Sequence, residues 1–195
     1  ACARTAPRWA KKPERPDVEW RIERRTTVTS TMDVAADLAG RGAPVGTVVV
    51  AEEQTAGRGR MGRVWLAPPG TCLLFTALFR PPLAVAQSPT LLRDIGERVA
   101  AAVAEATGVQ PTIKEPNDLL IDGKKVAGIL VQTSIRGDHL DYLLIGIGLN
   151  VNLPEDLLPV PTATSLLIAT GREHDREALL RAILRHLERV PGLAG

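Results

Sequence analysis

The stretch EEQTAGRGRMGRVW, residues 52–65, holds three glycines and three arginines close together. Gly57, Gly59 and Gly62 have the spacing G-x-G-x-x-G, which is also the spacing of a dinucleotide-binding loop. That motif requires a helix directly after its last glycine and an acidic residue about 20 residues further on. Here a Pro-Pro-Gly sequence follows, and residues 54–93 contain no Asp or Glu. The stretch is therefore not a Rossmann loop.

An extended loop with this composition is suited to binding an anion. Glycines allow backbone N–H groups to approach a ligand closely. Arg58 and Arg60 are two residues apart, so in an extended loop they point the same way. Guanidinium groups bind phosphate oxygens through paired hydrogen bonds. The stretch alone favours a loop that closes over phosphates, but a solvated basic loop or an RG-type nucleic-acid segment also fits it.

The composition is that of an ordinary globular protein. The chain has 195 residues, 45% hydrophobic and 24% charged, which is enough for one domain with a core. It has no apolar run long enough to cross a membrane and no secretory signal at its N-terminus, so we expect a cytoplasmic protein. Cys2 and Cys72 form no C-x-x-C pair, and the three histidines have no metal-ligand spacing.

Charge is unevenly distributed along the chain. Residues 1–25 contain eight Lys or Arg and four Asp or Glu, and we expect them to form a basic, flexible leader. Residues 26–195 contain no repeat and no long linker, which predicts a single domain. An RNA-binding protein that uses the leader and the Arg-Gly loop is an alternative, but aromatic residues for base stacking make up only 3% of the chain.

The hydrophobic pattern predicts an α/β (α+β) fold: a mixed, largely antiparallel sheet flanked by helices. The segment 30–40 begins with a capping-box pattern at Ser30, and the segment 88–108 has Ser88 at its cap and Pro89 at its first helical position. Asp122-Gly123 is a strong hairpin signal. The expected helices are 30–40, 88–108 and 174–190, and the expected strands are 46–54, 71–80, 111–121, 124–134 and 141–152.

Polar residues also gather on the later strands. Lys114, Asn117, Asp118 and Lys125 lie on or beside two neighbouring strands, and a proline fixes the turn before Asn117. Gly146 and Gly148 share one face of a strand, which lets a flat ligand lie close to the backbone. Asn150 continues that face with a donor and an acceptor suited to a base edge.

Taken together, these segments resemble the biotin protein ligase family. The resemblance covers about residues 26–189. It is carried by Q-T-A-G-R-G-R-x-G-R-x-W at 54–65, PND at 116–118, KVAGIL at 125–130, IGIGLNVN at 145–152 and ATSL at 163–166. It implies a class II synthetase-like catalytic domain of the biotin–lipoate ligase type. It also implies a ligase that uses ATP and Mg²⁺ to convert biotin to biotinyl-5′-AMP. The activated biotin is then transferred to a lysine of the biotin carboxyl carrier domain of a carboxylase.

The resemblance also implies roles for individual residues. Arg58 and Arg60 belong to the loop that orders over the adenylate, and Lys125 reaches both the biotin carboxylate and the phosphate. Lys114 and Asp118 are expected on the phosphate and metal side. The remaining expected ligand-binding residues are Ser30, Thr31 and Gln54 at the ureido ring; Gly128 and Leu130 along the biotin pocket; Trp65 and Asn150 near the adenine; and Met32, Gly57, Gly59, Arg63, Asn117 and Gly146.

Three departures from the family pattern bear on activity. Glu115 stands where the family has Trp, and Met32 stands where an Asn often follows the Ser-Thr pair. The chain also lacks the length for the winged helix or the small C-terminal β-barrel of many relatives, so we expect neither domain and no operator binding. The oligomeric state stays open, a homodimer included. The alternatives are a catalytically impaired biotin- or nucleotide-binding relative and a lipoate or octanoyl transferase-type enzyme.

Overall fold

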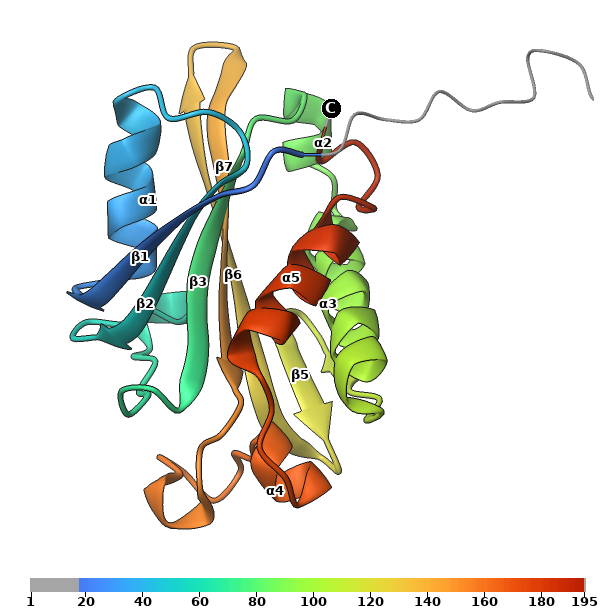
Figure 1. The fold of residues 1–195 in the computed structure, drawn as a ribbon. Coiled ribbons are helices and arrows are strands. Elements are labelled where there is room, and N and C mark those ends of the chain that lie inside the picture. Colours follow the sequence, from blue (N-terminus) through green and yellow to red (C-terminus); the bar gives the residue numbers. More distant parts are fainter. Residues whose placement is uncertain (1–17, 195) are drawn as a thin grey trace, which may run out of the picture.

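The computed structural model describes residues 18–194, which form a seven-stranded sheet with helices on both faces (Figure 1). The strand order is β1-β2-β3-β7-β6-β5-β4. The strands are β1 (Arg21–Val28), β2 (Thr47–Gln54), β3 (Cys72–Phe79), β4 (Thr112–Lys114), β5 (Asp118–Ile121), β6 (Lys124–Arg136) and β7 (His139–Asn150). The helices are α1 (Thr31–Gly40), α2 (Leu83–Ala86), α3 (Leu91–Thr107), α4 (Leu166–Thr170) and α5 (Arg176–Leu187), with short 3-10 turns at Arg60–Gly62 and Glu155–Leu157.

The sheet is mixed and largely antiparallel, which confirms the predicted fold class. Strands β1 and β2 run parallel, and the other neighbouring pairs of the described sheet run antiparallel. Asp122 and Gly123 have φ angles of 50° and 76°, so the predicted Asp-Gly turn joins β5 to β6. The β6–β7 hairpin turns between Arg136 and His139. No helix among residues 18–194 is both long and apolar enough to cross a bilayer.

Several predicted boundaries need correction. The expected leader, residues 1–25, overlaps β1, so the sheet begins no later than Arg21; residues 1–17 lie outside the described part. Helix α3 begins at Leu91 with Thr90 at its N-cap, so Ser88 and Pro89 precede it. The segment 111–121 is two short strands, because the turn at Pro116 separates β4 from β5.

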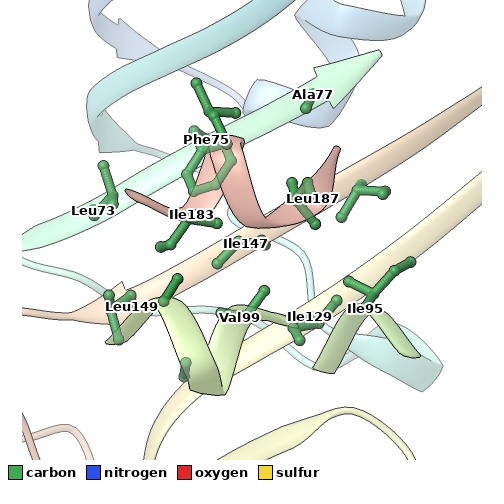
Figure 2. Packing of buried hydrophobic residues seen from close by; sticks show 14 of the residues in the cluster. Leu73, Phe75, Ala77, Ile95, Val99, Ile129, Ile147, Leu149, Ile183 and Leu187 are labelled. Carbon is green, nitrogen blue, oxygen red and sulfur yellow. The ribbon is translucent and has the colours of Figure 1, made fainter. Parts of the chain in front are cut away.

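One face of the sheet is covered by α3 and α5, and this interface holds most of the core. The strand register aligns Phe75 of β3, Ile147 of β7 and Ile129 of β6 in one row. Val99 of α3 and Ile183 of α5 belong to the same buried cluster (Figure 2). Burying side chains of this size stabilises the fold by about 1.5–3 kcal/mol each.

The opposite face is covered only in part, by α1. Ser30 caps this helix by accepting a hydrogen bond from the Met32 backbone N–H at 3.2 Å. Met32, Ala35 and Ala39 pack in a second buried cluster with residues of β2, β3 and β7. Helix α1 contacts these three strands, so the ends of β6 and β7 on this face are left for other segments to cover.

Candidate functional site

A cavity lies on the α1 face, between the start of α1, the loop that follows β2, and strands β6 and β7. The strand register aligns Thr76 of β3, Gly146 of β7 and Leu130 of β6 in one row, in which Gly146 and Leu130 line the cavity. The next row is Leu74, Gly148 and Gly128. The predicted site residues that line the cavity are Ser30, Thr31, Met32, Gln54, Arg58, Gly59, Arg60, Arg63, Trp65, Asn117, Lys125, Gly128, Leu130 and Gly146.

One end of the cavity is built from amide and hydroxyl groups. The Gln54 Oε1 atom accepts hydrogen bonds from the Thr31 N–H at 2.8 Å and from the Thr31 hydroxyl at 3.1 Å. The Thr31 and Thr76 hydroxyl oxygens are 2.8 Å apart. Sequence reasoning missed Thr76, which is fully buried and meets the cavity-lining Thr31 through this contact. This end suits a neutral ligand group that both donates and accepts hydrogen bonds.

The middle of the cavity is a glycine surface on which larger side chains rest. A Cβ atom built on Gly148 would lie 2.6 Å from Cε2 of Trp65, and one on Gly128 would lie 2.9 Å from its Cζ3. A Cβ on Gly146 would lie 2.8 Å from the Met32 sulfur. The Trp65 indole N–H is buried and has no hydrogen-bond partner among the described residues. These positions need glycine because the tryptophan and the methionine pack directly against the strand backbone.

The other end of the cavity is cationic. The Lys125 Nζ lies 2.7 Å from Oδ1 of Asp118 and 5.3 Å from the centre of the Trp65 ring. Arg58 lines the cavity beside the start of α1, where it forms an ion pair with Asp33. Arg60 and Arg63 also line the cavity. A ligand with a neutral polar head and an anionic tail matches both ends.

The loop that carries the arginines has the shape of a small hairpin. Arg58 and Val64 form an antiparallel bridge, the Gly59 N–H donates to the Arg63 carbonyl at 2.7 Å, and the Trp65 N–H donates to the Gly57 carbonyl at 2.9 Å. Gly57 does not line the cavity. It lies under the Trp65 backbone, where a Cβ would be 2.5 Å from the Trp65 carbonyl oxygen.

A second hollow adjoins the first on the other side of Trp65. Trp65 and Lys125 line both, and the second hollow adds Leu66, Val160 and Asn150. Asn150 is 4% exposed, and its amide donates to the Thr164 carbonyl at 2.8 Å. Its oxygen accepts from the Cys72 thiol at 3.5 Å, and burial raises the pKa of that thiol.

The remaining predicted residues have other positions. Asn117 is nearly buried, and its amide donates to the Ile129 carbonyl at 3.0 Å, so it ties the β4–β5 turn to β6. Asp118 reaches the site through its ion pair with Lys125. Lys114 and Glu115 are exposed and line neither hollow.

The fold and the cavity together define a synthetase-like domain with a cavity suited to a small molecule that has a polar head and an anionic end. The model of the biotin/lipoate A/B protein ligase family matches residues 24–150. The chain belongs to this family.

Individual relatives are biotin ligases. The chain is 40% identical over 167 residues to the bifunctional ligase/repressor BirA of Bacillus subtilis, covering 83% of this chain and 51% of BirA. It is 35% identical over 175 residues to the biotin--[acetyl-CoA-carboxylase] ligase of Mycobacterium tuberculosis, covering 83% of this chain and 61% of that ligase. The chain thus spans about half the length of BirA.

Solved structures give the same fold. The biotin protein ligase of Aquifex aeolicus in complex with biotin and ATP superimposes with a TM-score of 0.69 at 34% identity, covering 85% of this chain and 67% of that one. The ligase of Leishmania major in complex with biotinyl-5-AMP gives a TM-score of 0.73 at 31% identity, covering 87% of this chain and 74% of that one. These likenesses confirm the class II synthetase-like fold expected from the sequence.

Proposed function

We propose that this chain is a biotin protein ligase. It activates biotin with ATP to biotinyl-5′-AMP and passes the biotinyl group to a lysine of the biotin carboxyl carrier domain of a carboxylase. The observation that carries this proposal is the cavity itself, in which the Thr31–Gln54 end is joined by a glycine floor to Lys125. The cavity and the adjoining hollow share Trp65 and Lys125, so together they suit the two parts of an acyl adenylate.

The first step brings two anions together. A biotin carboxylate oxygen attacks the α-phosphorus of ATP, the new C–O–P linkage forms, and the bond to pyrophosphate breaks. Lys125, Arg58 and Arg60 line the cavity, where they offset the repulsion and stabilise the charge that builds on the phosphoryl oxygens. Lys125 is a charged residue that lines both hollows, so it is placed to contact both reacting groups.

The polar end holds the head of biotin. Its ureido ring offers two N–H donors and one carbonyl acceptor, which fit the hydroxyl and amide groups of Ser30, Thr31 and Gln54. Gly128, Leu130 and Gly146 form the surface along the ring system and its chain. The complexes of the Aquifex and Leishmania ligases, with biotin and ATP and with biotinyl-5-AMP, support this assignment by similarity.

Magnesium enters this proposal with the nucleotide. Mg²⁺ usually keeps several waters and binds through one or two carboxylates together with substrate phosphates. Asp118, 2.7 Å from Lys125, is the carboxylate that adjoins the cationic end of the cavity. Asp118 would hold such a metal, which would neutralise phosphate charge there, and its ion pair orients Lys125.

The second step uses a nucleophile that the partner brings. The amine of the carrier lysine attacks the biotinyl carbonyl, an amide bond forms, and AMP leaves. Basic side chains of the loop, Arg60 and Arg63, hold the AMP phosphate while the carrier approaches. The name of the Mycobacterium relative, an acetyl-CoA-carboxylase ligase, supports a carboxylase carrier as the partner.

The test measures biotinyl-5′-AMP by mass spectrometry after mixing the protein with biotin and MgATP. The wild-type chain forms the adenylate, and Lys125→Met slows its formation by about 100-fold or more, the order of loss expected when a charge-stabilising group is removed. Lys124→Met is the matched control, because Lys124 is exposed and lines neither hollow. No adenylate and no biotin binding by the wild-type chain would refute the proposal.

A second arm of the test supplies a carrier domain from a carboxylase. The wild-type chain adds one biotinyl group to its lysine, and the Lys125→Met variant reaches a comparable rate only when synthetic biotinyl-5′-AMP is provided. Equal transfer by both proteins from biotin and ATP would contradict the assigned role of Lys125.

A further inference from the structure

The polar end of the cavity is held from behind by a threonine that does not itself line it. Thr76 of β3 is fully buried and is not one of the cavity residues. Its hydroxyl oxygen is 2.8 Å from the hydroxyl oxygen of Thr31, which does line the cavity. A Cβ on Gly146 would lie 3.5 Å from the same Thr76 oxygen, so this hydroxyl lies beside the glycine floor.

The number of available protons fixes the direction of each hydrogen bond in this network. The Thr31 backbone N–H can only donate, so the Gln54 atom that lies 2.8 Å from it is the amide oxygen. The same oxygen accepts the single proton of the Thr31 hydroxyl at 3.1 Å. Thr76 is therefore the donor in its contact with Thr31.

These directions decide what the Thr31 hydroxyl offers to a ligand. A hydroxyl oxygen has one proton to donate and two lone pairs to accept with. In Thr31 the proton goes to Gln54, and one lone pair accepts from Thr76. The second lone pair is left for the cavity, so Thr31 presents an acceptor there. An N–H of the biotin ureido ring is the group that matches it.

The network joins three elements at the point where the polar end is built. Thr76 comes from β3, Thr31 is the first residue of α1, and Gln54 is the last residue of β2. The Thr31 N–H belongs to the first turn of α1, where a helix supplies no acceptor of its own, and Gln54 provides one. Neighbouring hydrogen bonds in a buried network also strengthen one another. Loss of the Thr76 hydroxyl therefore changes how Thr31 is held.

We propose that Thr76 is a positioning residue for biotin, which donates to Thr31 and so holds the Thr31 hydroxyl as an acceptor for a ureido N–H. The proposal rests on the proposed function, because it names the group that orients one of the biotin contacts. Thr76→Val replaces the donor by a methyl group of similar size. This change favours the Thr31 rotamer that turns its own methyl group toward position 76, and the acceptor then turns away from the ligand.

The experiment compares Thr76→Val and Thr76→Ser with the wild-type chain. Serine keeps the donor and tests for rescue. Thr76→Cys, with a weaker donor of similar size, replaces the valine variant if that protein fails to fold. Each protein is first checked by thermal melting. Isothermal titration then measures the affinity for biotin and for desthiobiotin, which keeps the ureido ring but lacks the thioether ring, and steady-state kinetics give the KM for ATP.

Thr47→Val is the matched control. Thr47 is also a buried threonine of the sheet, and its hydroxyl donates to the Pro44 carbonyl at 2.8 Å. It lies at the opposite end of β2 from Gln54 and lines neither hollow. A general effect of losing a buried hydroxyl appears in both valine variants, whereas a displaced Thr31 appears only in Thr76→Val.

We expect Thr76→Val to weaken biotin binding by about tenfold, the order expected for one hydrogen bond between neutral groups. Desthiobiotin binding should weaken by the same factor, Thr76→Ser should recover to within about threefold of wild type, and the KM for ATP should change by less than about twofold. In a Thr31→Val background, Thr76→Val should weaken binding by less than about twofold, because the residue through which it acts is already gone.

An NMR measurement tests the same point without activity or ligand. The γ-methyl ¹³C signal of Thr31 reports the rotamer of that side chain. It should shift in Thr76→Val and stay unchanged in Thr76→Ser and in Thr47→Val.

Three results would overturn the proposal. Losses that multiply in the Thr31→Val, Thr76→Val double variant would show that the two residues act independently. A loss confined to biotin would mean that Thr76 acts on the thioether ring instead. An unmoved Thr31 signal in folded Thr76→Val would show that Thr76 does not orient Thr31. If the wild-type chain binds no biotin but the Thr31 signal moves as expected, the hold of Thr76 on Thr31 stands and the proposed function fails instead.

Discussion

At the scale of the single residue, Gly148 gives the sharpest prediction. A Cβ at this position would lie 2.6 Å from the Trp65 ring, closer than real Cβ contacts, so Gly148→Ala displaces the indole from the floor of the site. We expect biotin affinity to fall about tenfold or more, which corresponds to about 1.4 kcal/mol. Isothermal titration with biotin measures the loss.

Gly96→Ala is the control for that substitution. Its Cβ would lie 3.6 Å from Cδ1 of Ile113, an ordinary contact, inside the long helix α3. Replacing a helical glycine by alanine stabilises a protein by about 0.5–1 kcal/mol. Biotin affinity should stay at the wild-type value while the urea midpoint rises. Unchanged affinity in Gly148→Ala would show that Trp65 is not held against the glycine floor.

Glu115 is the residue at which the sequence departs most clearly from its family. It is exposed and lines neither hollow, so we expect Glu115→Trp to change the rate of adenylate formation by less than about threefold. Parallel mass-spectrometric time courses on the two proteins test this. An increase of tenfold or more would mean that the glutamate restrains catalysis.

Sequence motifs located much of the cavity at this scale, because its residues come from segments whose glycine and arginine spacing is informative in itself. Arg58 was named from that spacing and Gln54 from the family resemblance, and both line the cavity. Thr76 was missed because a single threonine in an apolar strand has no distinguishing pattern. The hydrogen bond from Asn150 to Thr164 joins residues 14 positions apart through the fold, so no local pattern indicates it.

At the scale of the element, the arginine-rich hairpin 57–65 is joined to α1 by the ion pair between Arg58 and Asp33. Both side chains are about half exposed, so the pair contributes about 0–1 kcal/mol and leaves global stability almost unchanged. Asp33→Ala should instead free the hairpin locally. We expect trypsin to cleave at Arg58, Arg60 or Arg63 several times faster, as followed by mass spectrometry.

Asp37→Ala provides the comparison for the hairpin. Asp37 lies one turn further along α1 and pairs with Arg41, away from the hairpin. Its removal should leave the cleavage rate at the wild-type value. Similar cleavage of all three proteins would mean that contacts other than the ion pair hold the hairpin.

Helices and strands differed in how well their sequence revealed them. Strand β6 and the turn before it follow from an apolar run and an Asp-Gly pair. Strand β1 escaped prediction because it is an edge strand whose residues are mostly exposed, so RIERRTTV shows no apolar alternation. Its place is set by pairing with the buried strand β2, a contact across 26 residues of chain between Arg21 and Thr47.

At the scale of the whole molecule, His174 links stability to pH. Burial first and the nearby Arg172 charge second lower the pKa of this imidazole below its usual 6.5. The unfolded chain then binds a proton more readily than the folded one. The stabilisation of the folded state by neutral His174 is therefore complete above pH 6.5. It is lost as the pH falls from 6.5 through the lower pKa that His174 has in the folded chain.

Urea unfolding at pH 7.5, 6.5 and 5.5 measures this effect. The wild-type free energy of unfolding should decrease across the series, and His174→Gln should make the decrease smaller. The lowered pKa of Glu105, caused mainly by its hydrogen bond to His186, acts only below pH 4.5 and so does not contribute to this window. Equal slopes for wild type and His174→Gln would refute the assignment.

Helices α3 and α5 pack on one side of the sheet and contribute no residue to either hollow of the site. Substitutions on opposite sides, separated by a sheet layer of about 10 Å, are expected to act additively. The sheet thus separates the α3–α5 core on one face from the cavity on the other. An engineer could rework the α3–α5 side for heat resistance or solubility while the recognition side keeps its specificity, and evolution has had the same freedom.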